Sequence, residues 1–161
     1  MKILNRFLLF TFIVCILLSI LLYFGLKNEV GDITKDNNDN PSFKTKGKVY
    51  QYYQSGAKYK GDRKEIKDIL LSKKIESKTL NQGWIVTRFI VNSQGITDRF
   101  RFFCIDKNYN NIKLDSKEEK YILNIIRSLK NWQIGEIDNA NVDSYYQITF
   151  KVENGKVTDI F

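Results

Sequence analysis

Residues 83–105, GWIVTRFIVNSQGITDRFRFFCI, contain two runs of strand-forming residues on either side of one short turn. Gly83 to Val91 is rich in β-branched and aromatic side chains, and residues 92–95, NSQG, have the composition of a tight turn. Ile96 to Ile105 is a second run of the same kind. The stretch therefore predicts a β-hairpin around which the rest of the domain is arranged.

One helix is predicted on each side of this hairpin. The first runs from Asp62 to about Lys74 and the second from Ser116 to Leu129. Each begins with a capping-box pattern and continues with apolar residues at helical spacing. Further strands are predicted at residues 49–53, 142–152 and 156–161, the second of them from its alternation of apolar and polar residues. Together these elements predict an α+β fold of β-α-β-β-α-β order, an antiparallel sheet of three to five strands with two helices on one face.

Far from the hairpin, residues 7–26, FLLFTFIVCILLSILLYFGL, form a stretch of 20 residues without a charge. A helix of that length spans roughly 30 Å, the thickness of the hydrocarbon core of a bilayer. Lys2 and Arg6 precede the stretch, and positively charged flanks stay in the cytoplasm. The expected location is the inner membrane, crossed once, with the N-terminus inside and the C-terminal domain in the periplasm.

Two other interpretations of the stretch are less consistent with its residues. A cleaved signal peptide would have a shorter apolar core and a small-residue cleavage site, whereas this run ends in Tyr23-Phe24-Gly25-Leu26. A lipidated cysteine would follow small residues near the end of the run, but Cys15 follows Phe12-Ile13-Val14 and lies in its middle.

The predicted domain organisation follows from these segments. Residues 1–6 form a cytoplasmic N-terminus and residues 7–26 a transmembrane helix. Residues 27–47 are polar and rich in Asn and Asp, which predicts a disordered tether. Residues 48–161 form one folded domain, because about 135 residues beyond the apolar stretch suffice for one core.

Composition excludes several classes of function. The chain has no histidine, which removes His-based acid–base catalysis, catalytic triads and the commonest zinc and haem ligands. The carboxylates could suggest acid–base chemistry or a calcium loop, but they are better explained as helix caps and strand ends; they are Asp98, Asp106, Asp115, Glu118 and Glu119. We therefore expect no enzyme, no cofactor and no metal. The net charge of +8 is spread along the chain, so no nucleic-acid partner is expected.

The order of elements resembles the C-terminal domain family of TonB-like energy transducers. The resemblance covers residues 59–152, and the residues that carry it are Gly83, Phe89, Val91, Gly95, Trp132 and Gly135, with Tyr146-Gln147-Ile148-Thr149-Phe150 in the position of the last strand. It implies a protein-binding domain, with an envelope protein such as an outer-membrane receptor as partner and TonB-dependent transport as its setting. The sequence departs from the family in having one proline, a short tether and no histidine in the apolar stretch. Fold is therefore implied more firmly than energy transduction.

A docking site is expected on the strand at 142–152, which this topology places at an edge of the sheet. Its polar face carries Tyr145, Gln147, Thr149 and Lys151, and these four are the predicted partner-binding residues. An open edge would bind an extended partner segment by backbone hydrogen bonds. The alternative is a structural or accessory envelope protein that forms a homodimer through the same edge. In either case, residues 156–161 are expected to cover the edge at rest.

Overall fold

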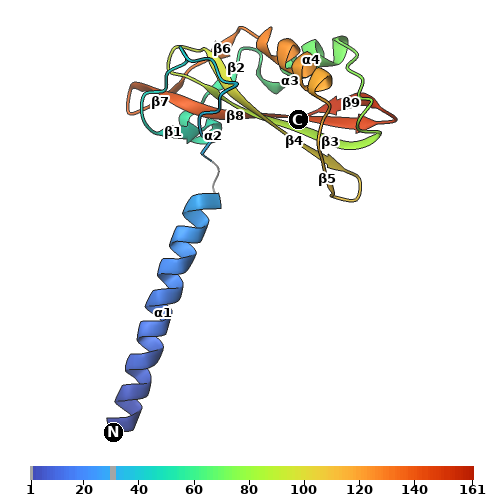
Figure 1. Cartoon of the computed structure of the whole chain (residues 1–161). Helices are drawn as coiled ribbons and strands as arrows, with labels where there is room; N and C mark the ends of the chain where they lie inside the picture. The colour runs from blue at the N-terminus through green and yellow to red at the C-terminus, as the bar shows by residue number, and fades with distance from the viewer. Residues whose placement is uncertain (1, 30–31) are drawn as a thin grey trace. The chain divides into compact units, whose positions relative to one another are not determined.

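In the computed structural model, the backbone is described for residues 2–29 and 32–161, and side chains for all of these except residues 2–4, 7 and 24–29. The chain divides into two compact units, residues 1–32 and residues 33–161 (Figure 1).

The first unit consists of one helix, α1 (Lys2–Glu29), of 28 residues. Within the residues that the structure describes, no helix is both long and apolar enough to cross a membrane. Phe7 and residues 24–26 lie outside the described side chains. The predicted transmembrane helix, and with it the predicted single-pass inner-membrane location, is contradicted by this finding.

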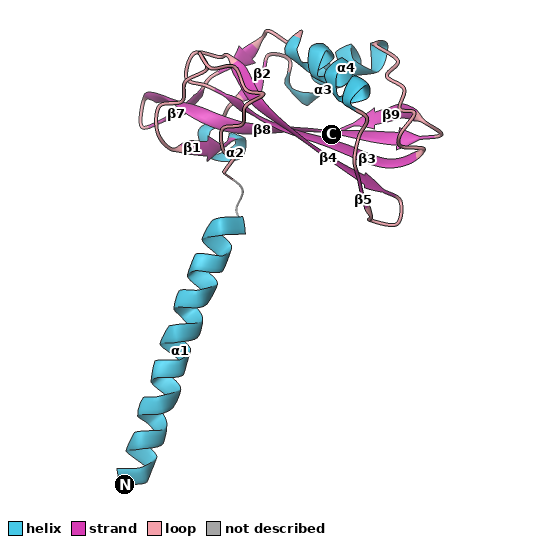
Figure 2. Ribbon diagram, viewed as in Figure 1, coloured by secondary structure: helices cyan, strands magenta, loops and turns pink. Residues whose placement is uncertain are grey.

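The second unit is built on a mixed sheet of seven strands in which β8 is the longest (Figure 2). Its main path is β1-β8-β3-β4-β5, and β7 and β9 also pair with β8. The strands are β1 (Val49–Gln51), β3 (Gln82–Val91), β4 (Thr97–Asp106), β5 (Asn111–Ile112), β7 (Gly135–Ile137), β8 (Ala140–Glu153) and β9 (Lys156–Ile160). A second sheet pairs β2 (Lys58–Tyr59) with β6 (Trp132–Gln133).

Three helices accompany the sheets: α2 (Tyr52–Ser55), α3 (Asp62–Ser72) and α4 (Ser116–Arg127). The fold is α+β, but the predicted antiparallel sheet of three to five strands behind a transmembrane helix is wrong. β1 runs parallel to β8, so the sheet is mixed rather than antiparallel. The strands that the sequence did not predict, β2, β5, β6 and β7, have only two or three residues each. Strands that short form because neighbouring chain segments present paired backbone groups, and no periodic pattern in the sequence marks them.

The β3–β4 hairpin lies at the centre of the fold, as its sequence suggests. The turn is closed by the N–H of Asn92, which donates to the carbonyl of Ile96, and Gly95 adopts a positive φ of 77°. A bulge follows on β4, where Arg99 has a φ of 57° and the pairing register with β3 shifts. The extra residue of the bulge shifts by one position the alternation of β4 side chains between the two faces of the sheet.

The core lies between the sheet and the two longer helices, α3 and α4, which cover one face of it (Figure 1). Aromatic rings pack edge to face at its centre: Phe89 lies 5.3 Å from Trp132, and Trp132 lies 4.8 Å from Tyr146 between ring centroids. The helices contribute Leu70 and Ile126, which are almost fully buried. These residues are the buried faces that the helical spacing of the sequence indicates.

The C-terminal strand β9 belongs to this core. Ile160 is buried in the main apolar cluster, and Val157 packs against it. The N–H of Val157 donates to the carbonyl of Ile75, and the N–H of Ser77 donates to the carbonyl of Gly155, so the β8–β9 hairpin is bonded on its second side as well. A segment held on both sides and buried is a structural strand rather than a removable cover.

Residues 33–47, expected as part of a disordered tether, pack onto the sheet. Ile33 and Phe43 are buried with Ile90 and Tyr145 in a second apolar cluster on the face without α3 and α4. The buried carboxylate of Asp143 accepts hydrogen bonds from the N–H groups of Lys46 and Ser93. Two apolar anchors and these backbone bonds hold the segment in place despite its polar composition.

Candidate functional site

Part of the outer edge of β4 is left open beside a cavity. On its inner side β4 pairs with β3 over its whole length, whereas on its outer side it pairs with β5 only at Cys104 and Ile105. Beyond the β5 pairing, the N–H of Asp106 donates outward to the carbonyl of Asn110. Backbone groups of alternate residues point to the same side of a strand. The outward groups of β4 therefore belong to Cys104, Phe102 and Phe100.

Phe102 is the position where this edge is free. The carbonyl of Phe100 accepts a hydrogen bond of 2.8 Å from the Arg101 guanidinium, and Cys104 is paired with Ile112. For the outward N–H and C=O of Phe102, no partner exists among the described residues. An extended segment could exchange two backbone hydrogen bonds there without displacing any strand.

This edge forms one side of a cavity of ≈ 270 Å³, which we call the β4 groove. Helix α4 forms the facing wall through Glu119, Leu123 and Arg127, and residues 36–39 close one end. The groove is thus built from three segments that are distant in sequence. The complete lining consists of Asp36, Asn38, Asp39, Asp98, Phe100, Arg101, Phe102, Phe103, Glu119, Leu123 and Arg127.

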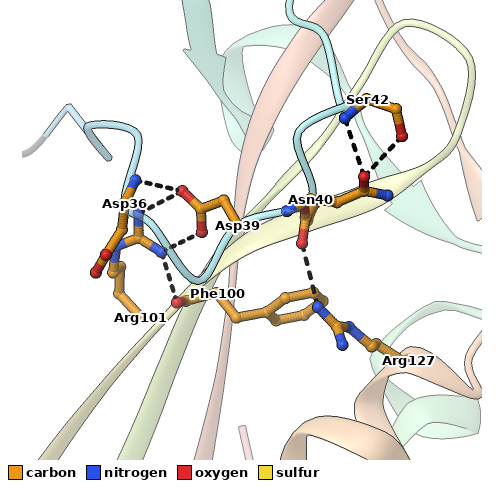
Figure 3. A network of polar contacts seen from close by, with 8 residues as sticks. Asp36, Asp39, Asn40, Ser42, Phe100, Arg101 and Arg127 are labelled. Carbon is orange, nitrogen blue, oxygen red and sulfur yellow. Dashed lines mark hydrogen bonds and ion pairs between the residues drawn. The ribbon is translucent and has the colours of Figure 1, made fainter.

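A partly buried ion pair fixes the end wall of the β4 groove (Figure 3). Arg101 donates from both terminal nitrogens to the two carboxylate oxygens of Asp39, each at 2.8 Å, and from Nη2 to the carbonyl of Thr34 at 2.6 Å. The N–H of Asp36 donates to Asp39 at 2.7 Å. The Arg101 hydrogen bond holds the pKa of Asp39 below its usual range, against the upward effect of burial. The same bond raises the pKa of Arg101.

A second pair joins the strand to the helix wall. Arg127 donates to the buried carboxylate of Asp98 at 3.3 Å, and its guanidinium lies 5.4 Å from the ring centroid of Phe100. Asp98 also accepts from the N–H of Asn40 at 2.8 Å, so one carboxylate ties α4, β4 and the 33–47 segment together. The side-chain oxygen of Asn40 in turn accepts from the N–H and hydroxyl of Ser42 (Figure 3).

The β4 groove carries more negative than positive charge. Four carboxylates line it, those of Asp36, Asp39, Asp98 and Glu119, against the two guanidiniums of Arg101 and Arg127. Both arginines are engaged with Asp39 and Asp98, so the surplus lies on Asp36 and Glu119. A cationic side chain would be attracted to this surplus. In the described part of the chain, no cluster of side chains is suited to hold a metal ion.

The predicted partner-binding residues lie on β8, apart from this groove. Tyr145 is buried and paired with Gln51 of β1. Thr149 exchanges two backbone hydrogen bonds of 2.9 Å with Phe161. Lys151 pairs with Asp159 and forms an ion pair of 2.8 Å with Glu153. Gln147 alone among the four is exposed at an unpaired stretch of the β8 edge.

The residues that carry the family resemblance have structural positions. Phe89, Val91 and Trp132 are buried in the core. A Cβ atom on Gly83 would lie 2.1 Å from the carbonyl oxygen of Ile105, and one on Gly135 would lie 2.5 Å from Ser144 Oγ. Only glycine fits at these two close approaches. None of these residues lines the β4 groove.

The sequence interpretation missed the segment that closes the groove. Asp36 and Asp39 fall within residues 27–47, whose polar composition indicates disorder. The available signal was the pair Ile33 and Phe43, two apolar residues ten positions apart in a polar segment. No known protein family, curated protein or solved structure matches this chain.

Proposed function

We propose that residues 33–161 form a protein-binding domain that takes an extended segment of a partner along the β4 groove. The observation that carries this proposal is the unpaired outward N–H and C=O of Phe102 beside a cavity. Backbone groups left open on a sheet edge are the usual basis of recognition by strand addition. This is the binding mode expected from the resemblance to TonB-like C-terminal domains, here assigned to β4 rather than to β8.

The walls of the groove favour one kind of segment. The carboxylates of Asp36 and Glu119 call for a Lys or Arg side chain in the ligand, and the apolar side chain of Leu123 and the ring of Phe102 call for an apolar neighbour. Successive side chains of a strand point to opposite faces. A basic and an apolar residue that both face the groove would therefore be an even number of positions apart in the segment. We therefore propose a basic, strand-forming segment as the ligand.

Selection of displayed random peptides on the full chain tests this function. Peptides that bind should combine Lys or Arg with β-branched or aromatic residues, and Glu119→Lys should weaken their binding by about tenfold, because it turns attraction into repulsion. Glu76→Lys makes the same charge change at an exposed position outside the groove and should leave binding unchanged. Binding that is equal in both variants, or selection of acidic peptides, would contradict the proposal.

A further inference from the structure

A second cavity lies between residues 40–46 and the β3–β4 turn at residues 92–96. We call it the turn cavity. Its volume is ≈ 370 Å³, which is within the range of sites that hold small ligands. It shares no lining residue with the β4 groove. The two cavities are therefore separate places on the domain.

The side chain of Asn92 holds the two walls of the turn cavity together. Its Oδ1 accepts from the N–H of Gln94 at 3.0 Å and from the N–H of Ile96 at 2.9 Å. Its Nδ2 donates to the carbonyl of Lys44 at 3.3 Å. Phe43 anchors the same wall in the second apolar cluster. Because the fold itself fixes both walls, a ligand does not have to order them when it binds.

The charged residues that line the turn cavity are both positive. They are Lys44 and Lys46, and the lining contains neither a carboxylate side chain nor a chain end. Among the described residues, neither ammonium group has an ion-pair partner. The buried carboxylate of Asp143 lies outside the lining, and its two oxygens accept the N–H groups of Lys46 and Ser93. The cavity therefore attracts an anion.

Two hydroxyl groups supply uncharged donors beside the lysines. Ser93 is only 7% exposed and lines the turn cavity, and its hydroxyl has no hydrogen-bond partner among the described residues. The hydroxyl of Thr45, on the opposite wall, is likewise without a partner in the described part of the chain. Both hydroxyls are therefore available to donate to a ligand.

These groups match a phosphate monoester better than a carboxylate. A phosphate monoester carries a charge of about −1.5 to −2 at pH 7 and three strong acceptor oxygens, enough for two ammonium groups and the hydroxyls. A carboxylate has one charge, and its planar shape is best matched by the fork of an arginine, whereas lysines act as compact point charges. The side chain of Ile96 is 53% exposed in the same lining and provides an apolar surface for the organic group of the ester.

We propose that the turn cavity binds the phosphate group of a small phosphate monoester. Lys44 and Lys46 bind the phosphate oxygens, the Ser93 hydroxyl donates to one of them, and the organic group packs against Ile96. This contact with the organic group favours a monoester over inorganic phosphate. The site goes beyond the peptide binding proposed for the β4 groove, and neither proposal depends on the other.

Isothermal titration calorimetry on the full chain tests the site with three probes: phenyl phosphate, inorganic phosphate and benzoate. Phenyl phosphate should bind about tenfold more tightly than either of the others. Inorganic phosphate lacks the apolar contact with Ile96, and benzoate lacks the second charge. Absence of phenyl phosphate binding, or equal affinities for phenyl phosphate and one of the other two probes, overturns the proposal.

Charge variants locate the binding. Lys44→Gln and Lys46→Gln should each weaken phenyl phosphate binding by about tenfold, because each removes a charge-assisted hydrogen bond. Lys64→Gln removes the same charge from an exposed position on α3 outside the lining and should leave the affinity unchanged. An equal loss in all three variants would show attraction to the net charge of the protein and would overturn the site.

Ser93→Ala separates the cavity from its charge. The variant keeps both lysines and the N–H that donates to Asp143, so it should stay folded, as circular dichroism can verify. It should bind phenyl phosphate about fivefold more weakly, because it loses one hydrogen bond to the anion. Ile96→Ala should reduce the preference for phenyl phosphate over inorganic phosphate. Wild-type affinities in both variants would contradict the proposed position of the ligand.

Discussion

At the scale of single residues, the bidentate contact between Asp39 and Arg101 has the clearest consequences for stability. The Asp39 side chain is 5% exposed, and its pKa lies below the ordinary value of 3.8 because Arg101 donates to it. A carboxyl group whose pKa is lower in the folded state stabilises the fold above its unfolded pKa. That contribution is lost as the pH falls through the folded value.

We predict that Asp39→Asn lowers the free energy of unfolding at pH 7 by about 2 kcal/mol, since it removes a buried charge partner of Arg101. The difference from the wild type should shrink as the pH falls below about 4, because protonation then removes the same interaction from the wild type. Urea unfolding at several pH values measures both quantities. Asp68→Asn, at an exposed position on α3, is the control, and a difference independent of pH would contradict the assignment.

At the scale of elements, the packing of β9 distinguishes two interpretations of the C-terminal hairpin. The hairpin is either a displaceable cover or a structural part of the core. The sequence favours a cover over the β8 edge that a partner could displace. In the structure Ile160 is 6% exposed, and the hairpin is bonded to β8 on one side and to residues 75–77 on the other. Displacing it would uncover the core beneath α3, so the predicted docking mechanism at this edge is not the one that the structure favours.

We therefore expect deletion of residues 154–161 to unfold the domain rather than to activate binding. Ile160→Ala, a smaller change, should lower the free energy of unfolding by about 3 kcal/mol, the typical effect of truncating a buried isoleucine. Thermal and urea unfolding measure both effects. The matched control is Thr158→Ala on the exposed side of the same strand. If the deletion variant folds, residues 154–161 are a displaceable cover and the prediction is wrong.

At the scale of the whole molecule, the segment 33–47 connects stability to the β4 groove. Phe43 and Ile33 attach the segment to the sheet, and the same segment supplies the end wall of the groove through Asp36 and Asp39. Loosening the apolar anchor should therefore also disorder the wall, although Phe43 itself does not line the groove.

Phe43→Ala should lower the free energy of unfolding by about 3 kcal/mol and should weaken binding of the basic peptides selected on the wild type. Limited proteolysis should cleave the variant within residues 33–47 faster than the wild type, because the segment opens locally. Tyr109→Ala removes an exposed aromatic ring near the far end of β4 and should change neither property. Unchanged proteolysis in Phe43→Ala would show that the segment is held by its polar contacts alone.

The sequence by itself determined the local elements. The β3–β4 hairpin, helices α3 and α4 and the alternation of β8 follow from turn residues, helical spacing and strand propensity, all of which act between near neighbours. Asp115, rather than Ser116, caps α4 by accepting from the N–H of Lys117, a shift of one position. Such small errors are typical of predicted helix ends.

Only the tertiary structure decided which sheet edge stays open and which segments close the site. Asp39 and Arg101 are 62 positions apart, and Asn40 and Asp98 are 58 positions apart. A pattern within one element cannot indicate contacts over such separations. The parallel pairing of β1 with β8 has the same origin, because both strands must first be placed by the rest of the fold. The open edge at Phe102 arises in the same way, because β5 pairs with β4 only at Cys104 and Ile105.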